Sequence, residues 1–65
     1  MHITVNGNSE DVDTLTISDL VCEKNIDPSS LVVEYNGQVI RSDKWGQTLL
    51  KEGDQLELLS FVGGG

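Results

Sequence analysis

Only one stretch of this chain repeats its apolar residues at the spacing of a helix. Ile17, Leu20 and Val21 fall on one helical face, and residues 16–19 resemble a capping box at the start of the segment. We expect the helix to end near Asn25, because a proline-containing turn follows and cannot continue it. One short helix cannot enclose a core alone, so the rest of the chain must supply a sheet.

The segments around this helix alternate apolar and polar residues or are rich in β-branched ones, as strands are. Turn residues separate them at 6–9, 36–37 and 52–54, and Asn36-Gly37 is the strongest hairpin signal. Val12 is the expected inward contact of the second strand, and residues 41–46 are too polar for more than one helical turn. The predicted strands are residues 1–5, 10–14, 31–35, 38–40 and 55–58.

This order of elements predicts an α+β architecture: a ubiquitin-like β-grasp fold with a four- to five-stranded mixed sheet and one covering helix. The first and last strands are expected side by side in the centre of the sheet. We expect one β-grasp domain over residues 1–62 and a flexible C-terminal glycine tail over residues 63–65.

The charge balance excludes two classes of partner. Eleven acidic residues stand against four basic ones, giving a formal net charge of −7 at pH 7. No basic stripe is present to neutralise phosphates, so we expect neither nucleic-acid binding nor attachment to anionic membranes. A basic protein surface is the natural complement, because opposite charge accelerates encounter.

The cysteine and histidine counts limit the disulfides and metal sites that the chain can form. Cys22 is the only cysteine, so no internal disulfide can form. With His2 as the only histidine, we expect no histidine-based metal site. No apolar run approaches the ~18 residues of a membrane span, and no signal-peptide pattern is seen. We expect a monomeric protein in the reducing cytoplasm.

Three glycines, Gly63, Gly64 and Gly65, follow the last apolar residues. Ordering glycine costs more backbone entropy than ordering any other residue, so we expect this tail to be mobile on its own. A frayed terminus or a leftover linker would explain it. The functional alternative is that a tail without side chains passes through a narrow tunnel and presents its α-carboxylate to another protein's active site. ATP could activate that carboxylate as an acyl-adenylate, and a persulfide could convert it to a thiocarboxylate.

A set of motifs in the second half of the chain carries a family resemblance. They are Asn36-Gly37, Arg41-Ser42, Trp45, Thr48, Gly53-Asp54, Glu57 and Phe61-Val62-Gly63-Gly64-Gly65. In these residues the chain resembles the ThiS family, the ubiquitin-like sulfur carriers of thiazole (thiamin) biosynthesis. The N-terminal half is similar mainly in length and pattern.

The resemblance implies a carrier that enzymes act on, with no bound cofactor and no catalysis of its own. Gly65 would be adenylated and thiocarboxylated, while Gly63 and Gly64 thread into the partner's active site. The implied partners are a ThiF-like adenylyltransferase, a ThiG-like thiazole synthase and a persulfide sulfur donor.

Other functions remain open at this point. The small subunit of molybdopterin synthase shares the fold and a terminal Gly-Gly, but often has two prolines before it, where this chain has Phe61-Val62. Carriers that serve other pathways are a related possibility. A ubiquitin-like modifier joined to lysines and an interaction module with an inert tail are the further alternatives.

The last strand contains two apolar sets. Leu56 and Leu58 share one face, whereas Leu59 and Phe61 share the opposite one. A β-bulge would turn the second set inward. Without a bulge, Leu59, Phe61 and the adjacent Val62 form an exposed patch that leads to the tail, and we favour this patch as a partner-docking surface.

Other conspicuous residues favour structural roles. We expect Cys22, which lies next to the apolar face of the helix, to be a small packing residue without a neighbour that would favour a thiolate. His2 should be exposed, and Trp45 should cover the edge of the core instead of stacking on a ligand. The acidic residues at 10, 11 and 13 lack the spacing of a calcium loop, so they predict a solvated face.

Overall fold

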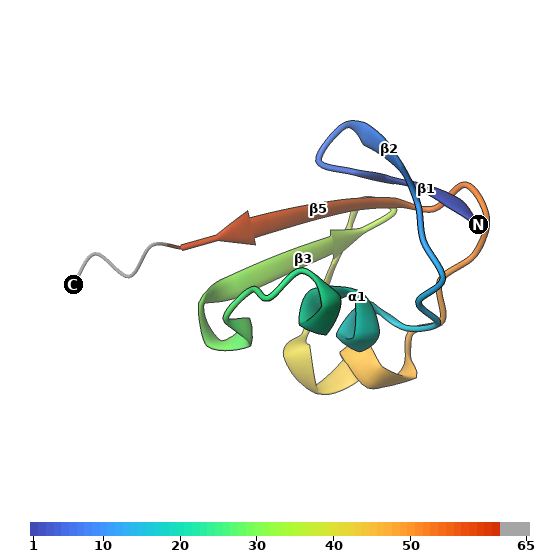
Figure 1. Ribbon diagram of the computed structural model, residues 1–65. Coiled ribbons are helices and arrows are strands. Elements are labelled where there is room, and N and C mark those ends of the chain that lie inside the picture. Colours follow the sequence, from blue (N-terminus) through green and yellow to red (C-terminus); the bar gives the residue numbers. More distant parts are fainter. Residues whose placement is uncertain (62–65) are drawn as a thin grey trace.

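The computed structural model describes residues 1–61, whose elements follow the expected order (Figure 1). Within these residues the strands are β1 (His2–Val5), β2 (Asn8–Asp11), β3 (Leu31–Tyr35), β4 (Gln38–Ile40) and β5 (Gln55–Ser60). The helices are α1 (Ile17–Glu23) and two 3-10 helices, η1 (Pro28–Ser30) and η2 (Ser42–Gln47). The predicted tail at 63–65, and the last residue of the predicted domain, lie outside the described residues.

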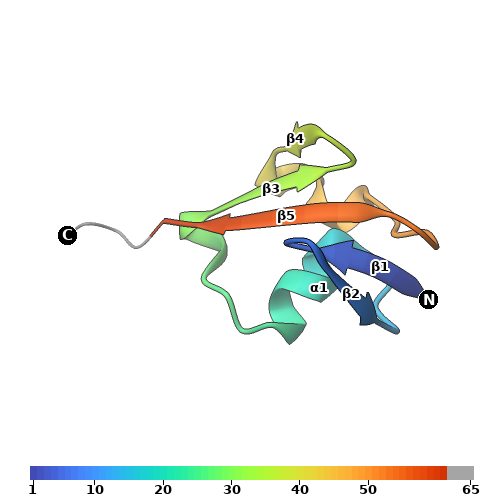
Figure 2. The same cartoon turned by 90° about the horizontal axis from the view of Figure 1, so that it is seen from above.

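The strands form one mixed sheet in the order β2-β1-β5-β3-β4. β1 and β5 are parallel neighbours, and β5 pairs antiparallel with β3 on its other side. Figure 2 shows β5 running through the middle of this sheet. α1 lies against one face, and in the described part of the chain no helix covers the other face (Figure 1). The predicted β-grasp arrangement, with the first and last strands side by side, is confirmed.

The core fills the space between α1 and the inner face of the sheet. Ile17, Leu20 and Val21 of α1 are buried as their spacing predicts. Each buried aliphatic side chain contributes about 1.5–3 kcal/mol. The buried apolar residues are Ile3, Val5, Val12, Ile17, Leu20, Val21, Leu31, Val33, Trp45, Leu50, Leu56 and Leu58.

Both hairpins use two-residue turns with left-handed backbone. Asn6 and Gly7 have φ of 51° and 83°, and Asn36 and Gly37 have φ of 50° and 88°. Positive φ at both positions is the mark of the type I′ turn, which matches the twist of the strands that it joins. The first turn is shorter than predicted, so β2 begins at Asn8, which pairs with Val5.

The helix begins as predicted and ends slightly earlier. The Thr16 hydroxyl accepts a hydrogen bond from the Asp19 amide at 3.1 Å, which confirms the predicted cap. α1 ends at Glu23, and Asn25 then adopts a left-handed φ of 57°. The Ile26 amide donates to the Val21 carbonyl at 3.4 Å, in the pattern that commonly closes helices.

Other boundaries also differ from the prediction. β1 begins at His2 and not at Met1. β2 ends at Asp11 and not at residue 14, although Val12 beyond it is buried as expected and its amide donates to the Met1 carbonyl. η2 is longer than one turn, because buried Trp45 holds this polar segment against the core. β5 continues to Ser60 instead of residue 58, since Leu31 of β3 still pairs with it there. η1 was not predicted.

Candidate functional site

β5 carries the chain from the middle of the sheet toward the glycine residues. Its antiparallel register with β3 is unbroken from Tyr35↔Leu56 to Leu31↔Ser60. One residue further, the Phe61 amide donates to the Ser30 carbonyl at 2.6 Å. The backbone is therefore held up to the last described residue. No bulge interrupts this pairing.

The unbroken register places the two apolar sets of β5 on opposite faces. Leu56 and Leu58 point into the core, with 1% and 7% of their surface exposed. Leu59 and Phe61 point away from α1 and are 49% and 59% exposed. The predicted exposure of these two side chains is confirmed, whereas Val62 lies outside the described residues.

Two further apolar side chains extend this exposed surface. Val32 of β3 lies directly opposite Leu59 in the register, and it is half-buried. Val39 of the edge strand β4 is 65% exposed and shares the same face. We call Val32, Val39, Leu59 and Phe61 the outer-face patch.

Asn6 holds the other edge of β5 after β1 has ended. Its side-chain Oδ1 accepts from the Leu58 amide at 2.7 Å, and its Nδ2 donates to the Leu58 carbonyl at 3.3 Å. The carboxamide thus takes the place of a peptide group in the sheet. From the sequence, Asn6 is predicted only as a turn residue. Its contact with Leu58 was not predicted, because nothing local indicates which strand lies beside the turn.

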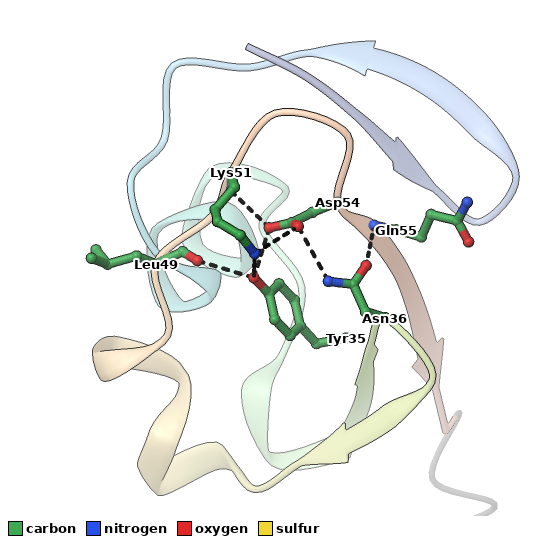
Figure 3. Close-up of polar contacts among 6 residues, drawn as sticks. All are labelled: Tyr35, Asn36, Leu49, Lys51, Asp54 and Gln55. Carbon is green, nitrogen blue, oxygen red and sulfur yellow. Dashed lines mark hydrogen bonds and ion pairs between the residues drawn. The ribbon is translucent and has the colours of Figure 1, made fainter.

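A buried carboxylate fixes the opposite end of β5. Asp54 is only 4% exposed, and Figure 3 shows the polar groups around it. Its Oδ2 accepts from the Tyr35 hydroxyl and from the Lys51 amide, both at 2.7 Å. Its Oδ1 accepts from Asn36 Nδ2 at 3.2 Å and from Lys51 Nζ at 3.3 Å. Asn36 Oδ1 in turn accepts from the Gln55 amide at 2.8 Å, which joins the β3–β4 turn to the start of β5.

These hydrogen bonds determine the ionisation of Asp54. Burial alone would raise its pKa, but hydrogen bonds from Tyr35, the Lys51 amide, Asn36 and the Lys51 ammonium outweigh burial, and the pKa lies below its usual value. The Tyr35 hydroxyl, followed by Asp54, raises the pKa of Lys51. We assign this network to positioning, since it lies at the end of β5 remote from Phe61. The sequence predicted a tight turn here but no buried charge.

The structure places the remaining candidates as follows. Trp45 is 4% exposed, and its indole Nε1 donates to the Ile40 carbonyl at 2.9 Å, so it covers the core as predicted. His2 is exposed, as expected. Among the acidic residues, Glu10 is not simply solvated, because it pairs with Lys24 of the helix end at 2.8 Å. Within residues 1–61, no three acidic, cysteine or histidine side chains are grouped to hold a metal ion.

The expectation for Cys22 was wrong. Cys22 is exposed. The inward face of α1 is occupied by Ile17, Leu20 and Val21, so Cys22 lies on the flank of the helix, outside the core. There it lines a pocket of about 330 Å³ together with residues of α1, η1 and η2, including Pro28 and Trp45.

Comparison with known proteins shows which family this chain belongs to. Residues 3–65 match the profile of the ThiS family, and the matched range includes the three glycines at 63–65. The chain belongs to the ThiS family. The predicted resemblance is thereby confirmed. No helix among the described residues of this family member has the length and apolar character needed to cross a membrane.

Relatives of the ThiS family show the same likeness over most or all of the chain. The sulfur carrier protein ThiS of Bacillus subtilis is 34% identical over 89% of this chain and 94% of its own length. The crystal structure of a thiamine biosynthesis protein (ThiS) from Geobacter metallireducens superimposes with a TM-score of 0.85 at 35% identity, covering all of both chains. A thiazole synthase of Paramagnetospirillum magneticum is 29% identical over the whole chain, which spans only 20% of that protein's length.

Proposed function

We propose that this protein is a sulfur carrier of thiamin biosynthesis that transports sulfur as a thiocarboxylate on Gly65. The observation that carries the proposal is the family match through residue 65, which includes the three terminal glycines. The likeness to the Bacillus sulfur carrier over nearly the full length of both proteins supports it. In this role the protein is a substrate of other enzymes and catalyses nothing itself.

The chemistry requires activation, because a carboxylate is a poor electrophile. In the proposed sequence a ThiF-like adenylyltransferase joins the Gly65 carboxylate to AMP and releases pyrophosphate from ATP. The terminal sulfur of a persulfide then attacks the acyl-adenylate and displaces AMP, which gives an acyl disulfide. A second thiol reduces the S–S bond of this intermediate, which releases the thiocarboxylate and leaves the donor in a disulfide. Sulfur has then replaced one carboxylate oxygen. Gly63 and Gly64 offer no side chains to obstruct a narrow entrance to the partner's active site. We place these steps in the cytoplasm, where thiols stay reduced.

A thiazole synthase is the proposed acceptor of the sulfur. Support comes from the thiazole synthase of Paramagnetospirillum magneticum, one fifth of which aligns with this entire chain. We propose that the outer-face patch docks on the partner enzymes, because Leu59 and Phe61 are exposed four and two residues before the first glycine of the tail, Gly63. Exposed apolar patches of this kind mark protein interfaces.

Mass spectrometry of the intact protein tests the proposal. The protein is incubated with a purified ThiF-type adenylyltransferase, ATP, a persulfide donor and an excess of a thiol as reductant, and a matched reaction omits ATP. We expect an ATP-dependent mass gain equal to the exchange of one oxygen for sulfur, located on Gly65 by fragmentation. Adducts linked to lysine would instead indicate a protein modifier, and an unchanged mass would indicate an inert tail.

A further inference from the structure

The outer face of the sheet carries a charge feature as well as the apolar patch. Glu34 of β3 and Glu57 of β5 are directly opposite partners in the antiparallel register. Both point away from α1, since Val33 and Leu58 beside them are buried in the core. The pair lies next to Val32 and Leu59, and Val39 is opposite Glu34 on the other side. Two like charges are therefore set among exposed apolar side chains.

Within the described residues this pair has no cationic partner. The ion pairs of residues 1–61 use Asp11, Glu52, Glu10, Asp43 and Asp54, and none includes Glu34 or Glu57. Like charges directly opposite each other in a sheet are destabilising. Covering the outer-face patch with an apolar partner would also remove water from the two carboxylates. That step is costly unless the partner supplies positive charge.

We infer that the outer sheet face binds a partner surface that places an arginine guanidinium across Glu34 and Glu57, with apolar side chains against Val39, Leu59 and Phe61. A guanidinium presents several N–H donors in a flat fork and is weakly hydrated, so it can pair with two carboxylates while lying among apolar groups. The net charge of −7 favours such a basic surface. The inference rests on the proposed function, whose docking step it specifies. We assign the contact to the adenylyltransferase, the first enzyme to meet the carrier.

Binding measurements with matched variants test this contact. Calorimetric titration of a purified ThiF-type adenylyltransferase without ATP gives the Kd of the wild-type chain, Glu34→Gln, Glu57→Gln and the double variant. The control is Glu23→Gln, which removes the same charge from an exposed position on α1. We expect the double variant to bind about tenfold more weakly or worse, because charge-assisted hydrogen bonds are lost, while the control stays close to wild type. Added salt should weaken binding of wild type more than binding of the double variant.

A charge reversal separates docking from folding. Glu57→Lys places opposite charges across the strands at Glu34 and should raise the melting temperature by about 1–4 °C. The same variant should bind the enzyme more weakly than wild type, because it repels the incoming guanidinium. Gain of stability with loss of binding supports the contact. If the double variant binds like Glu23→Gln, or if the wild-type chain does not bind at all, the inference is overturned. Wild-type binding without any pyrophosphate release on adding ATP contradicts only the proposed function.

Discussion

Asn6 and Asn36 occupy the same place in the two hairpins, and each has a second role beyond the turn. Each side-chain carboxamide binds β5, at Leu58 and at Gln55 respectively. Both residues also have left-handed backbone, with φ of 51° and 50°. Asp54 then connects Asn36 to Tyr35 and Lys51. The position of the central strand thus depends on a few polar side chains in addition to the apolar core.

Asp54 makes the stability depend on acid pH. Its folded-state pKa lies below the usual value of 3.8, so its contribution is present above about pH 4 and is lost as the pH falls through the folded-state pKa. At pH 7, Asp54→Asn should lower the free energy of unfolding by about 1–3 kcal/mol. Urea unfolding between pH 7 and pH 2 should show a shallower acid decline in this variant than in wild type.

Asp27→Asn is the control for that experiment. Hydrogen bonds from Ser29 lower the pKa of Asp27, but this residue is fully exposed and caps only η1. Its substitution should leave most of the acid decline in place. A decline of equal steepness in wild type and Asp54→Asn would contradict the assignment.

At the scale of the elements, local sequence signals were sufficient where one segment determines its own structure. The spacing of Ile17, Leu20 and Val21 predicted the helix, and Asn36-Gly37 predicted the β3–β4 hairpin. Contacts between distant segments were not predictable in this way. The two hydrogen bonds between the Asn6 side chain and Leu58, here called the Asn6 clamp, depend on strand register, as does the Glu34–Glu57 pair. The extent of η2 depends on where Trp45 is buried.

The Asn6 clamp predicts a local effect on β5. Asn6→Gly retains the left-handed turn and removes both hydrogen bonds to Leu58. We expect a loss of about 1–2 kcal/mol in the free energy of unfolding. Hydrogen exchange followed by NMR should accelerate at the Leu58 amide more than at the Leu31 amide in β3. Uniform acceleration across the sheet would mean that Asn6 has no specific role at this edge.

The opposite faces of β5 should respond differently to substitution. Leu56→Ala removes a side chain that is 1% exposed and should cost about 2–5 kcal/mol of stability. Leu59→Asp and Phe61→Asp alter exposed side chains and should cost far less stability. They should nevertheless weaken binding to the adenylyltransferase, by about 2 kcal/mol for a hot-spot residue. Thermal unfolding and calorimetric binding measure the two effects, and equal stability losses at all three positions would contradict the docking surface.

At the scale of the whole molecule, the proposed function separates the folded body from the reacting group. Backbone hydrogen bonds hold the chain as far as Phe61. Gly65, which carries the proposed reacting carboxylate, is the fourth residue after Phe61. If the patch fixes the body on the enzyme, the number of residues after Phe61 determines where the carboxylate arrives. Chain length should therefore control activation independently of stability.

Deleting Gly65 or adding one alanine after it tests this dependence. One residue of extended chain spans about 3.3–3.6 Å, whereas a displacement of ~1 Å can reduce a rate by ~100-fold. Both variants should lose nearly all ATP-dependent pyrophosphate release with the adenylyltransferase, although the shortened chain still ends in a glycine carboxylate.

Neither change removes a side chain from the core of residues 1–61, so the melting temperature should not move. Binding through the outer-face patch should also persist, which separates a misplaced carboxylate from failed docking. Activation of the alanine-extended protein at the wild-type rate would show that the C-terminal carboxylate is not positioned in this way, and the carrier proposal would fail.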